Sequence, residues 1–333
     1  GAVDSITTGD YNVGVGDNAL TAVTEGSRNT AISQGALSNN TTGTNNIAVG
    51  YYSLQANTTV GNNTAVGYNA LFSSTNGPNT AVGSQALKAN TTGYDNTAVG
   101  RNALTANTTG IRNAAFGDLT LDANTTGNYN SAFGAYALNA NTTGANNTAN
   151  GYQALYYNTT DSNNTAMGYR ALYTNTTGNR SVAVGANALL SSIAADGNTA
   201  VGYDALSSNT TAEINTAIGM NSLRLNITGA SNTAIGYNAG DNITTGSSNI
   251  IIGAGVDAPS ATASNQLNIG NWITGAAGAI TVPGSLTTAG FTSTGIDDNA
   301  TSTKLTISDT TITGVGAFTS TSIDATKLSG NLP

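Results

Sequence analysis

Apolar and polar positions recur along most of this chain with a period of 17 residues. The repeated motif is Asn-Thr-Ala-Val-Gly-Tyr-x-Ala-Leu-x-x-Asn-Thr-Thr-Gly, and the glycine of Ala-Val-Gly serves below as the reference position. One interval, between Gly67 and Gly83, is 16 residues long, and Ser33 takes the place of the glycine once. A fixed period is typical of stacked repeats, and it predicts sixteen coils over residues 12–270. The reference glycines are Gly16, Gly50, Gly67, Gly83, Gly100, Gly117, Gly134, Gly151, Gly168, Gly185, Gly202, Gly219, Gly236, Gly253 and Gly270.

Four other columns of residues follow the same spacing. An asparagine lies four residues before the reference position and an apolar residue lies one before it, as in Asn96 and Val99. An alanine lies three residues after it and a leucine four after it, as in Ala103 and Leu104. The leucine column is unbroken over thirteen coils: Leu20, Leu37, Leu54, Leu71, Leu87, Leu104, Leu121, Leu138, Leu155, Leu172, Leu189, Leu206 and Leu223.

This repeat predicts an all-β fold, a parallel β-solenoid. Helical repeats need about 33–47 residues per unit and strong helix formers, whereas this unit is short and rich in Gly, Asn and Thr. A coil of this length fits two short strands and two turns: Thr-Ala-Val forms one strand, and Ala-Leu begins the other. The reference glycine permits a positive φ, and Asn-Thr-Thr-Gly provides the second turn because Asn and Gly tolerate the left-handed region. Coils stacked at about 4.8 Å would build a rod roughly 75 Å long.

The interior of such a coil is expected to be apolar and thin. The Val/Ile and Leu columns should line it, and the Asn columns should form hydrogen-bonded ladders between coils. The alanine two residues before the reference position would then lie on the opposite face of the strand. A small apolar residue repeated on a second face suggests close approach of another chain, so we expect a homotrimer. The column expected near the chain–chain contact includes Ala48, Ala65, Ala98, Ala132, Ala166 and Ala200.

The period divides the chain into three parts. Residues 1–11 form an N-terminal lead-in, residues 12–270 the β-solenoid, and residues 271–333 a β-rich fibrous shaft or connector. In the third part the period fails, and alternating runs within residues 304–313 predict short strands of a slimmer segment. The 16-residue interval should shorten the turn at residues 75–78, because turns tolerate length changes better than strands do.

The composition limits the chemistry available to the chain. Charged residues make up 8% of it, and it contains neither Cys nor His, which excludes disulfides, His or thiolate metal sites and His-dependent nucleophiles. The net charge is −8 without a basic patch, and no apolar run reaches the roughly 18 residues of a membrane span. We therefore expect no enzyme, no catalytic or metal site, no cofactor, no nucleic-acid partner and no membrane insertion. No signal peptide is visible, so we expect a processed form or a fragment, with more polypeptide after Pro333.

The few charged residues suggest ion pairs more than catalysis. A glycosidase needs two carboxylates about 5–9.5 Å apart. Asp118 and Asp122 lie in one coil, but Arg101 lies one period before Asp118. Residues one period apart are neighbours in adjacent coils, so the spacing predicts pairing of Arg101 with Asp118 and of Asp95 with Arg112. Such pairs would set the register of the coils more than their stability.

Tyrosines recur after the reference position and gather in the ninth and tenth coils. The candidate carbohydrate contact consists of Tyr152, Tyr156, Tyr157, Tyr169 and Tyr173. Aromatic faces can stack on sugar rings, which is the functional interpretation. The structural interpretation is that the tyrosines stack on one another and shield the ladder.

Two short segments carry a resemblance to known protein families. The segments 46–50 (Asn-Ile-Ala-Val-Gly) and 181–185 (Ser-Val-Ala-Val-Gly) resemble the Ser-Val-Ala-Ile-Gly repeats in the heads of trimeric autotransporter adhesins. The longer motif with Asn-Thr-Thr-Gly, and the segment 293–301, are similar to bacteriophage tail fibres. The adhesin resemblance implies a trimeric left-handed parallel β-roll that binds host surfaces. The fibre resemblance is the closer one, because no coiled-coil stalk or membrane anchor is visible.

These resemblances imply a function and a location. We expect the rigid shaft of a phage tail fibre, in the virion and extracellular, that supports attachment to the host. Its partners would be two further copies of itself, other virion tail proteins, and a host glycan or protein met through a distal tip. One alternative is a bacterial surface adhesin head. Another is an ice-binding β-solenoid, although the evident Thr columns lie in the Asn-Thr-Thr turn.

Overall fold

The computed structural model describes residues 5–271, 273–276 and 279–281, all within one compact unit, Gly1–Ser285. The described part consists of strands and turns, without a helix, and its eighteen strands form one sheet. They are β1 (Val13–Val15), β2 (Thr30–Ile32), β3 (Ile47–Val49), β4 (Thr64–Val66), β5 (Asn79–Val82), β6 (Asn96–Val99), β7 (Ala114–Phe116), β8 (Ser131–Phe133), β9 (Thr148–Asn150), β10 (Thr165–Met167), β11 (Val182–Val184), β12 (Thr199–Val201), β13 (Thr216–Ile218), β14 (Thr233–Ile235), β15 (Ile250–Ile252), β16 (Gln266–Ile269), β17 (Ile273–Ala276) and β18 (Ala279–Thr281).

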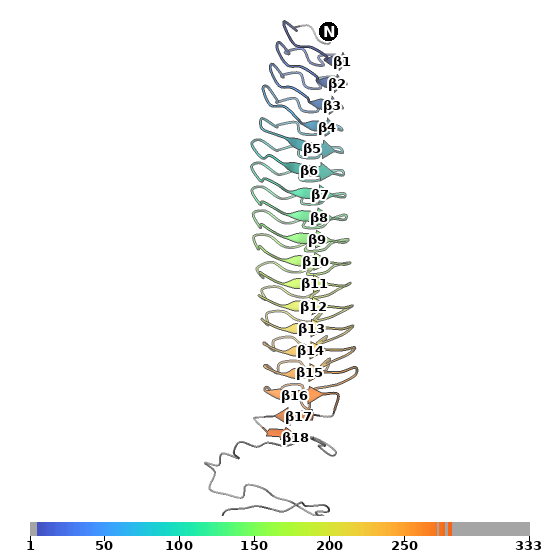
Figure 1. Ribbon diagram of the computed structural model, residues 1–333, viewed down its shortest axis with the longest axis vertical. Helices are drawn as coiled ribbons and strands as arrows, with labels where there is room; N and C mark the ends of the chain where they lie inside the picture. The colour runs from blue at the N-terminus through green and yellow to red at the C-terminus, as the bar shows by residue number, and fades with distance from the viewer. Residues whose placement is uncertain (1–4, 272, 277–278, 282–333) are drawn as a thin grey trace, which may run out of the picture. The chain divides into compact units, whose positions relative to one another are not determined.

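Strands β1 to β16 stack in parallel, one strand from each coil (Figure 1). Paired residues lie 17 apart, as in Val99 opposite Phe116. Between β4 and β5 they lie 16 apart, with Thr64 opposite Thr80, so the shortened turn leaves the strand register intact. The predicted parallel β-solenoid and its period are thereby confirmed. After β16 the pairing becomes antiparallel, to β17 and then β18. The strands predicted within residues 304–313 lie outside the described residues.

Each coil contains one strand, so the prediction of a second strand at Ala-Leu was wrong. That segment is a turn, because its leucine has a left-handed backbone, as shown by φ 54° at Leu104. Its amide groups nevertheless bond to the next coil: Leu104 N donates to Thr120 O (3.0 Å) and Ala106 N donates to Asp122 O (3.0 Å). Hydrogen bonds between coils therefore continue on the side of the stack that has no strand.

The interior holds the alanines of the strands, and the Val/Ile column lies outside. In the coil around Gly100, the side chains of Ala98, Ala103 and Leu104 are all fully buried, whereas Val99 is partly exposed. The expected faces were therefore reversed. A leucine enters from the turn side and leaves room for only a methyl group from the strand. The alanine column predicted near a chain–chain contact, from Ala48 to Ala200, is at 0% exposure inside the coils.

Two buried asparagine ladders run along the stack, as predicted. In the first, Asn96 N donates to Asn79 Oδ1 (3.0 Å), and Asn96 Nδ2 donates to Gly110 O (2.8 Å). In the second, Asn107 Nδ2 donates to Asn90 Oδ1 (2.8 Å) and to Gly110 O (3.1 Å). Since buried amides need partners, these ladders satisfy the polar groups at the two turns while tying each coil to the next.

Each repeat has a reference glycine after the strand and a second glycine in Asn-Thr-Thr-Gly, and the two are required for different reasons. Reference glycines from Gly16 to Gly253 have φ between 121° and 142°, a region that L side chains rarely adopt, as predicted. The glycine of Asn-Thr-Thr-Gly has no such φ, so the expected reason for it was wrong. A Cβ at Gly144 would collide with Asn141 Oδ1 and with Asp161 O of the next coil. Close approach between coils, and not backbone handedness, therefore selects glycine at that turn.

Candidate functional site: a tyrosine patch and an apolar sheet face

The structure brings the five predicted tyrosines together. Tyr152 stacks on Tyr169, with ring centroids 5.8 Å apart and planes 9° apart. Tyr156 stacks on Tyr173 at 5.5 Å and 27°, and Tyr157 meets both rings edge-on at 4.7 Å and 5.2 Å. Burial raises the pKa of Tyr173, and its neighbour Tyr157 acts in the same direction. Together they form one patch over adjacent coils, which we call the tyrosine patch.

Three further residues complete the tyrosine patch. Tyr136 lies edge-on to Tyr152, with centroids 6.0 Å apart. The Arg170 guanidinium lies 5.1 Å from the ring centroids of both Tyr169 and Tyr173, and Arg170 Nε donates to Gln153 Oε1 (2.9 Å). These residues were not predicted to belong to a site, although Gln153 and Arg170 are 17 residues apart and the period makes them neighbours in adjacent coils.

The geometry of the tyrosine patch favours mutual stacking of its rings. A ring that accepts a sugar needs a free face, and each stacked ring has one face covered by its partner ring, with the Arg170 guanidinium over Tyr169 and Tyr173. Tyr152, Tyr157 and Tyr169 remain 44–47% exposed. The patch therefore presents exposed rings around an interlocked cluster, and contact with a carbohydrate stays a prediction.

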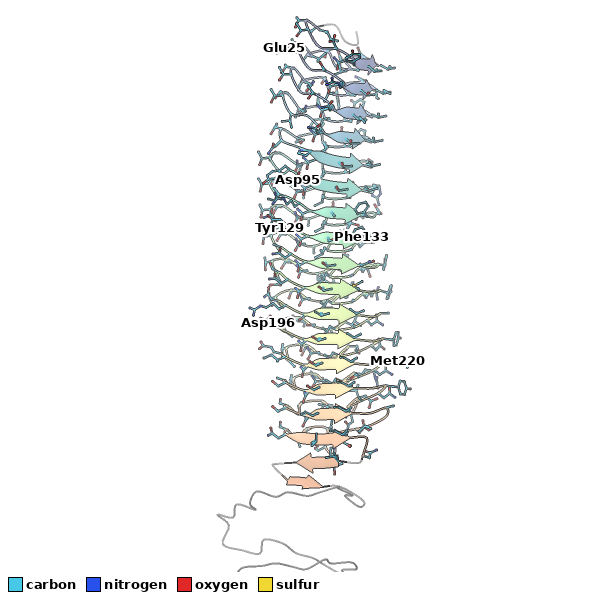
Figure 2. The ribbon with its side chains drawn as sticks, viewed as in Figure 1. Glu25, Asp95, Tyr129, Phe133, Asp196 and Met220 are labelled. Atoms are coloured by element: carbon cyan, nitrogen blue, oxygen red, sulfur yellow. The ribbon has the colours of Figure 1, made fainter. Side chains whose placement is uncertain are left out.

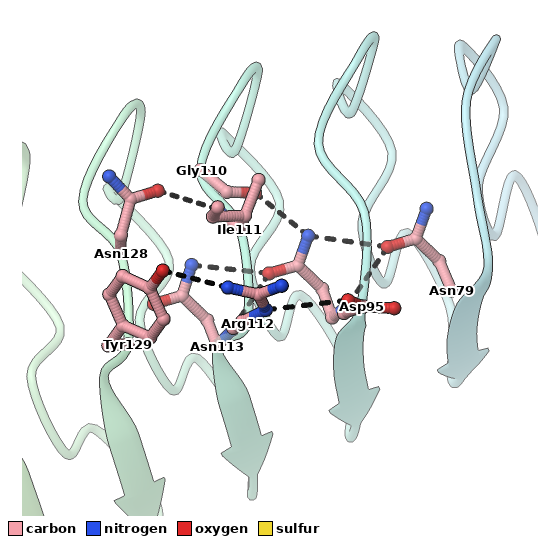
Figure 3. A network of polar contacts seen from close by, with 9 residues as sticks. Asn79, Asp95, Gly110, Ile111, Arg112, Asn113, Asn128 and Tyr129 are labelled. Carbon is pink, nitrogen blue, oxygen red and sulfur yellow. Dashed lines mark hydrogen bonds and ion pairs between the residues drawn. The ribbon is translucent and has the colours of Figure 1, made fainter.

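Both predicted ion pairs form between neighbouring coils. Arg101 Nη2 lies 2.8 Å from Asp118 Oδ2, and Arg112 Nε lies 3.5 Å from Asp95 Oδ2. Figure 3 shows Arg112 between Asp95 and Tyr129, whose hydroxyl accepts a hydrogen bond from Nη1 (2.8 Å). The same contact raises the pKa of Arg112. These side chains are 36–59% exposed, so each pair contributes little stability and mainly marks the register.

The carboxylates considered for glycan cleavage do not form an isolated pair. Asp118 is engaged by Arg101, while burial raises the pKa of Asp122. A depression of about 270 Å³ lies beside the shortened turn, lined by Pro78, Asn79, Thr80, Asp95, Asn96 and Thr97. Among the described residues there is no group of three or more Asp, Glu, His or Cys that could hold a metal ion.

The strands present a continuous uncharged surface of apolar and threonine side chains, which we call the outer face. It consists of the first and third residues of each three-residue strand from β1 to β15, and of the second and fourth residues of β5, β6 and β16. None of these residues is charged, and Asn150 is its only amide. Its most open apolar side chains range from 36% exposed at Val182 to 55% at Val15. Figure 2 places the labelled acidic residues on the side of the stack away from Phe133 and Met220.

The outer face also carries a threonine column. The Thr of Thr-Ala-Val was predicted to lie on a strand, but only the threonines of the Asn-Thr-Thr turn were considered for ice binding. Nine of its strands contribute a threonine beside the apolar residue, in the order Thr-x-apolar in all but one of them, β9. They are Thr30, Thr64, Thr80, Thr97, Thr148, Thr165, Thr199, Thr216 and Thr233. The outward direction of Thr follows once alanine is known to point inward, because side chains alternate along a strand.

Comparison with known proteins gives no relative from which a function could be inferred, so the proposed function rests on the fold and on these surfaces. The chain matches no protein-family model, no curated protein and no solved structure. In the part of the chain that the structure describes, no helix is long and apolar enough to cross a membrane.

Proposed function

We propose that the chain is the rigid shaft of an extracellular phage tail fibre, built as a homotrimer and supporting attachment to the host. The observation that carries this proposal is the unbroken parallel stack of sixteen strands, tied along its axis by backbone and asparagine ladders. A ladder of this kind resists bending and extension because every coil bonds to both neighbours. Other virion tail proteins would anchor the shaft, and a host glycan or protein would be met at a distal tip.

The repeat resembles both tail fibres and the heads of trimeric autotransporter adhesins. Whether the fibre belongs to a virion or to a bacterial surface therefore needs a direct test. The test is mass spectrometry of purified virions together with electron microscopy of fibres labelled at this chain. We expect the chain in the virion. Its presence on a bacterial surface and absence from virions would favour the adhesin head.

If the shaft only supports attachment made elsewhere, the tyrosine patch should not contribute to binding of the host. The double variant Tyr156→Ala with Tyr173→Ala should leave host attachment unchanged, while it lowers the denaturation midpoint because the ring stack is lost. Attachment is measured by adsorption of virions to host cells. Loss of adsorption by a variant whose circular dichroism is unchanged would assign host binding to the tyrosine patch instead.

Ice binding is a second candidate, and the threonine column on the outer face is what favours it. Regular threonines on a flat solenoid face can order water. Thermal hysteresis of the purified protein tests this function. Ice binding and burial of the outer face between copies exclude each other, because both use the same side chains.

A further inference from the structure

The outer face is a long uncharged surface of the size that proteins use for contacts. Its length over sixteen strands is about 70 Å at the usual spacing of parallel strands, and two side chains give it a width of roughly 10 Å. The resulting area is on the order of 700 Å². About two thirds of its side chains are apolar and the rest are mainly threonine, so the apolar part, on the order of 450 Å², is comparable to the largest apolar patches on monomers, which are often functional. The whole area is close to the roughly 800 Å² that each partner contributes to a stable interface.

The spacing of the outer face identifies its partner as a second copy of the chain. A partner that contacts it along its length must repeat every 4.8 Å or so, as the strands do. The same face of another copy has that repeat, and it has no charge that would be buried on contact. Closed cyclic symmetry is usual for homo-oligomers, and in the proposed trimer each copy would present the same outer face toward a common axis.

One residue on the outer face distinguishes the possible alignments of two copies. Asn150 is exposed, and its side chain makes no hydrogen bond within the described part of the chain. Its neighbours in the same column are Phe133 on β8 and Met167 on β10. A shift of one coil would place the amide against one of these side chains. An antiparallel alignment end to end would pair β9 with β8 and again oppose Asn150 to Phe133. Among parallel alignments, only the in-register one brings Asn150 to Asn150, where each amide finds a partner. The antiparallel alignment that pairs β9 with β9 leaves β1 without a counterpart in the parallel stack.

We propose that the outer face is the interface between parallel copies in register, and that Asn150 is the residue that fixes this register. A single polar layer in an apolar interface is known to select alignment at some cost in stability, because every other alignment leaves its amide unpaired. The inference rests on the proposed homo-oligomeric fibre and adds to it the contact surface and the residue that aligns the copies.

Cysteine cross-linking tests the alignment cleanly, because the chain contains no Cys. Val201→Cys on β12 and Ile218→Cys on β13 are placed at adjacent strands of the outer face and co-expressed. Mass spectrometry of the linked peptides after mild oxidation then counts the 201–201, 218–218 and 201–218 links. We expect the like-with-like links to be several times more frequent. Thr143→Cys, on a turn away from the outer face, is the control and should link rarely.

The variant Asn150→Val tests the register directly. We expect the variant to remain oligomeric and to show a larger fraction of 201–218 links, because slipped alignments no longer leave an amide unpaired. An unchanged link ratio would overturn the role of Asn150. Oligomers whose outer-face cysteines link no more than the Thr143→Cys control would overturn the interface and leave the fibre proposal standing. A stable, folded monomer in solution would overturn both, and thermal hysteresis of that monomer would assign the outer face to ice.

Discussion

At the scale of single residues, the asparagine ladders show where the repeat is incomplete. In the ladder of the Asn-Thr-Thr turn, three buried carboxamide oxygens lack a hydrogen bond, namely Oδ1 of Asn57, Asn175 and Asn226. In each case the next residue of that column is not asparagine: Ser74, Ser192 and Ile243 follow in turn. An unsatisfied buried acceptor costs about 1–3 kcal/mol, so each gap weakens the contact between two coils.

Replacing Ser192 by asparagine should therefore stabilise the solenoid. The new Nδ2 would reach Asn175 Oδ1, and the new Oδ1 would accept from Asn209. The neighbouring Ala195 is compatible with the ladder, since Asn209 already bonds to Ala212 O (3.0 Å). We expect Ser192→Asn to raise stability by about 1 kcal/mol, measured as the midpoint of guanidinium denaturation. The adjacent change Ser191→Asn is the control, and an equal effect there would argue against completion of the ladder.

Asp161 is a second residue that departs from the repeat, because it occupies the glycine place of Asn-Thr-Thr-Gly. It is 7% exposed, and its Oδ2 has no hydrogen bond. Burial raises the pKa of Asp161 from about 3.8 to about 6, and Asp196 acts in the same direction. Because the folded state disfavours the ionised form, this group stabilises the fold most below its ordinary pKa. That stability is lost as the pH rises from about 4 to about 6.

Asp161→Asn should remove this loss. At pH 7.5 we expect the variant to be more stable than the parent by on the order of 2 kcal/mol, and at pH 3.5 to be about equal. Denaturation midpoints across this pH range measure the effect. The exposed Asp17→Asn serves as the matched control. A gain for Asp161→Asn that is the same at both pH values would contradict ionisation as its cause.

At the scale of the element, the coil combines a favourable burial with an unfavourable backbone. Its leucine is fully buried, which stabilises by about 1.5–3 kcal/mol, although a left-handed backbone costs an L residue about 1–2 kcal/mol. Burial outweighs strain, so leucine persists at this turn over thirteen coils. Where the column ends, Gly240 takes the same place with φ 59°.

This balance predicts an unusual order of variants at Leu104. Leu104→Ala should cost about 2–4 kcal/mol by removing core volume. Leu104→Gly should be no worse, since glycine escapes the backbone strain, whereas glycine elsewhere is about 0.5–1 kcal/mol less stable than alanine. Denaturation midpoints provide the comparison, and Ala98→Gly on the strand should show the ordinary glycine cost. A Leu104→Gly protein clearly weaker than Leu104→Ala would refute the strain at this turn.

The coil also shows what the sequence could and could not predict. The period predicted the stack, the Asn ladders and the ion pairs, because residues 17 apart must be neighbours once coils are stacked. Alternation along Thr-Ala-Val separates Ala98 from Val99 but does not say which of them points inward. That depends on the space left by Leu104, which enters from a turn that was expected to be a strand. The tyrosine patch was predictable for the same reason as the ion pairs, whereas the outer face required the direction of the strand to be known.

At the scale of the whole molecule, the solenoid is a sum of nearly equal coils. Each strand pairs with the strands of the two adjacent coils, so stability should be a sum of coil terms and neighbour terms. The shortened turn at residues 75–78 already shows that one coil can change length while β4 and β5 keep their register.

Removal of one whole coil should therefore leave the fold intact. Deleting residues 199–215 joins Asn198 to Thr216 and so reproduces the Asn-Thr junction that precedes β13. We expect a folded solenoid shorter by about 4.8 Å, with circular dichroism per residue unchanged, measured together with particle length by electron microscopy. Deleting residues 199–207 instead removes β12 and leaves one coil, between β11 and β13, with eight residues more than the 17-residue period. Both ladders are interrupted there, so we expect a lower denaturation midpoint than for removal of a whole coil. Equal damage from the two deletions would mean that the coils are not independent units, and that register along the chain is held by something other than contacts between neighbours.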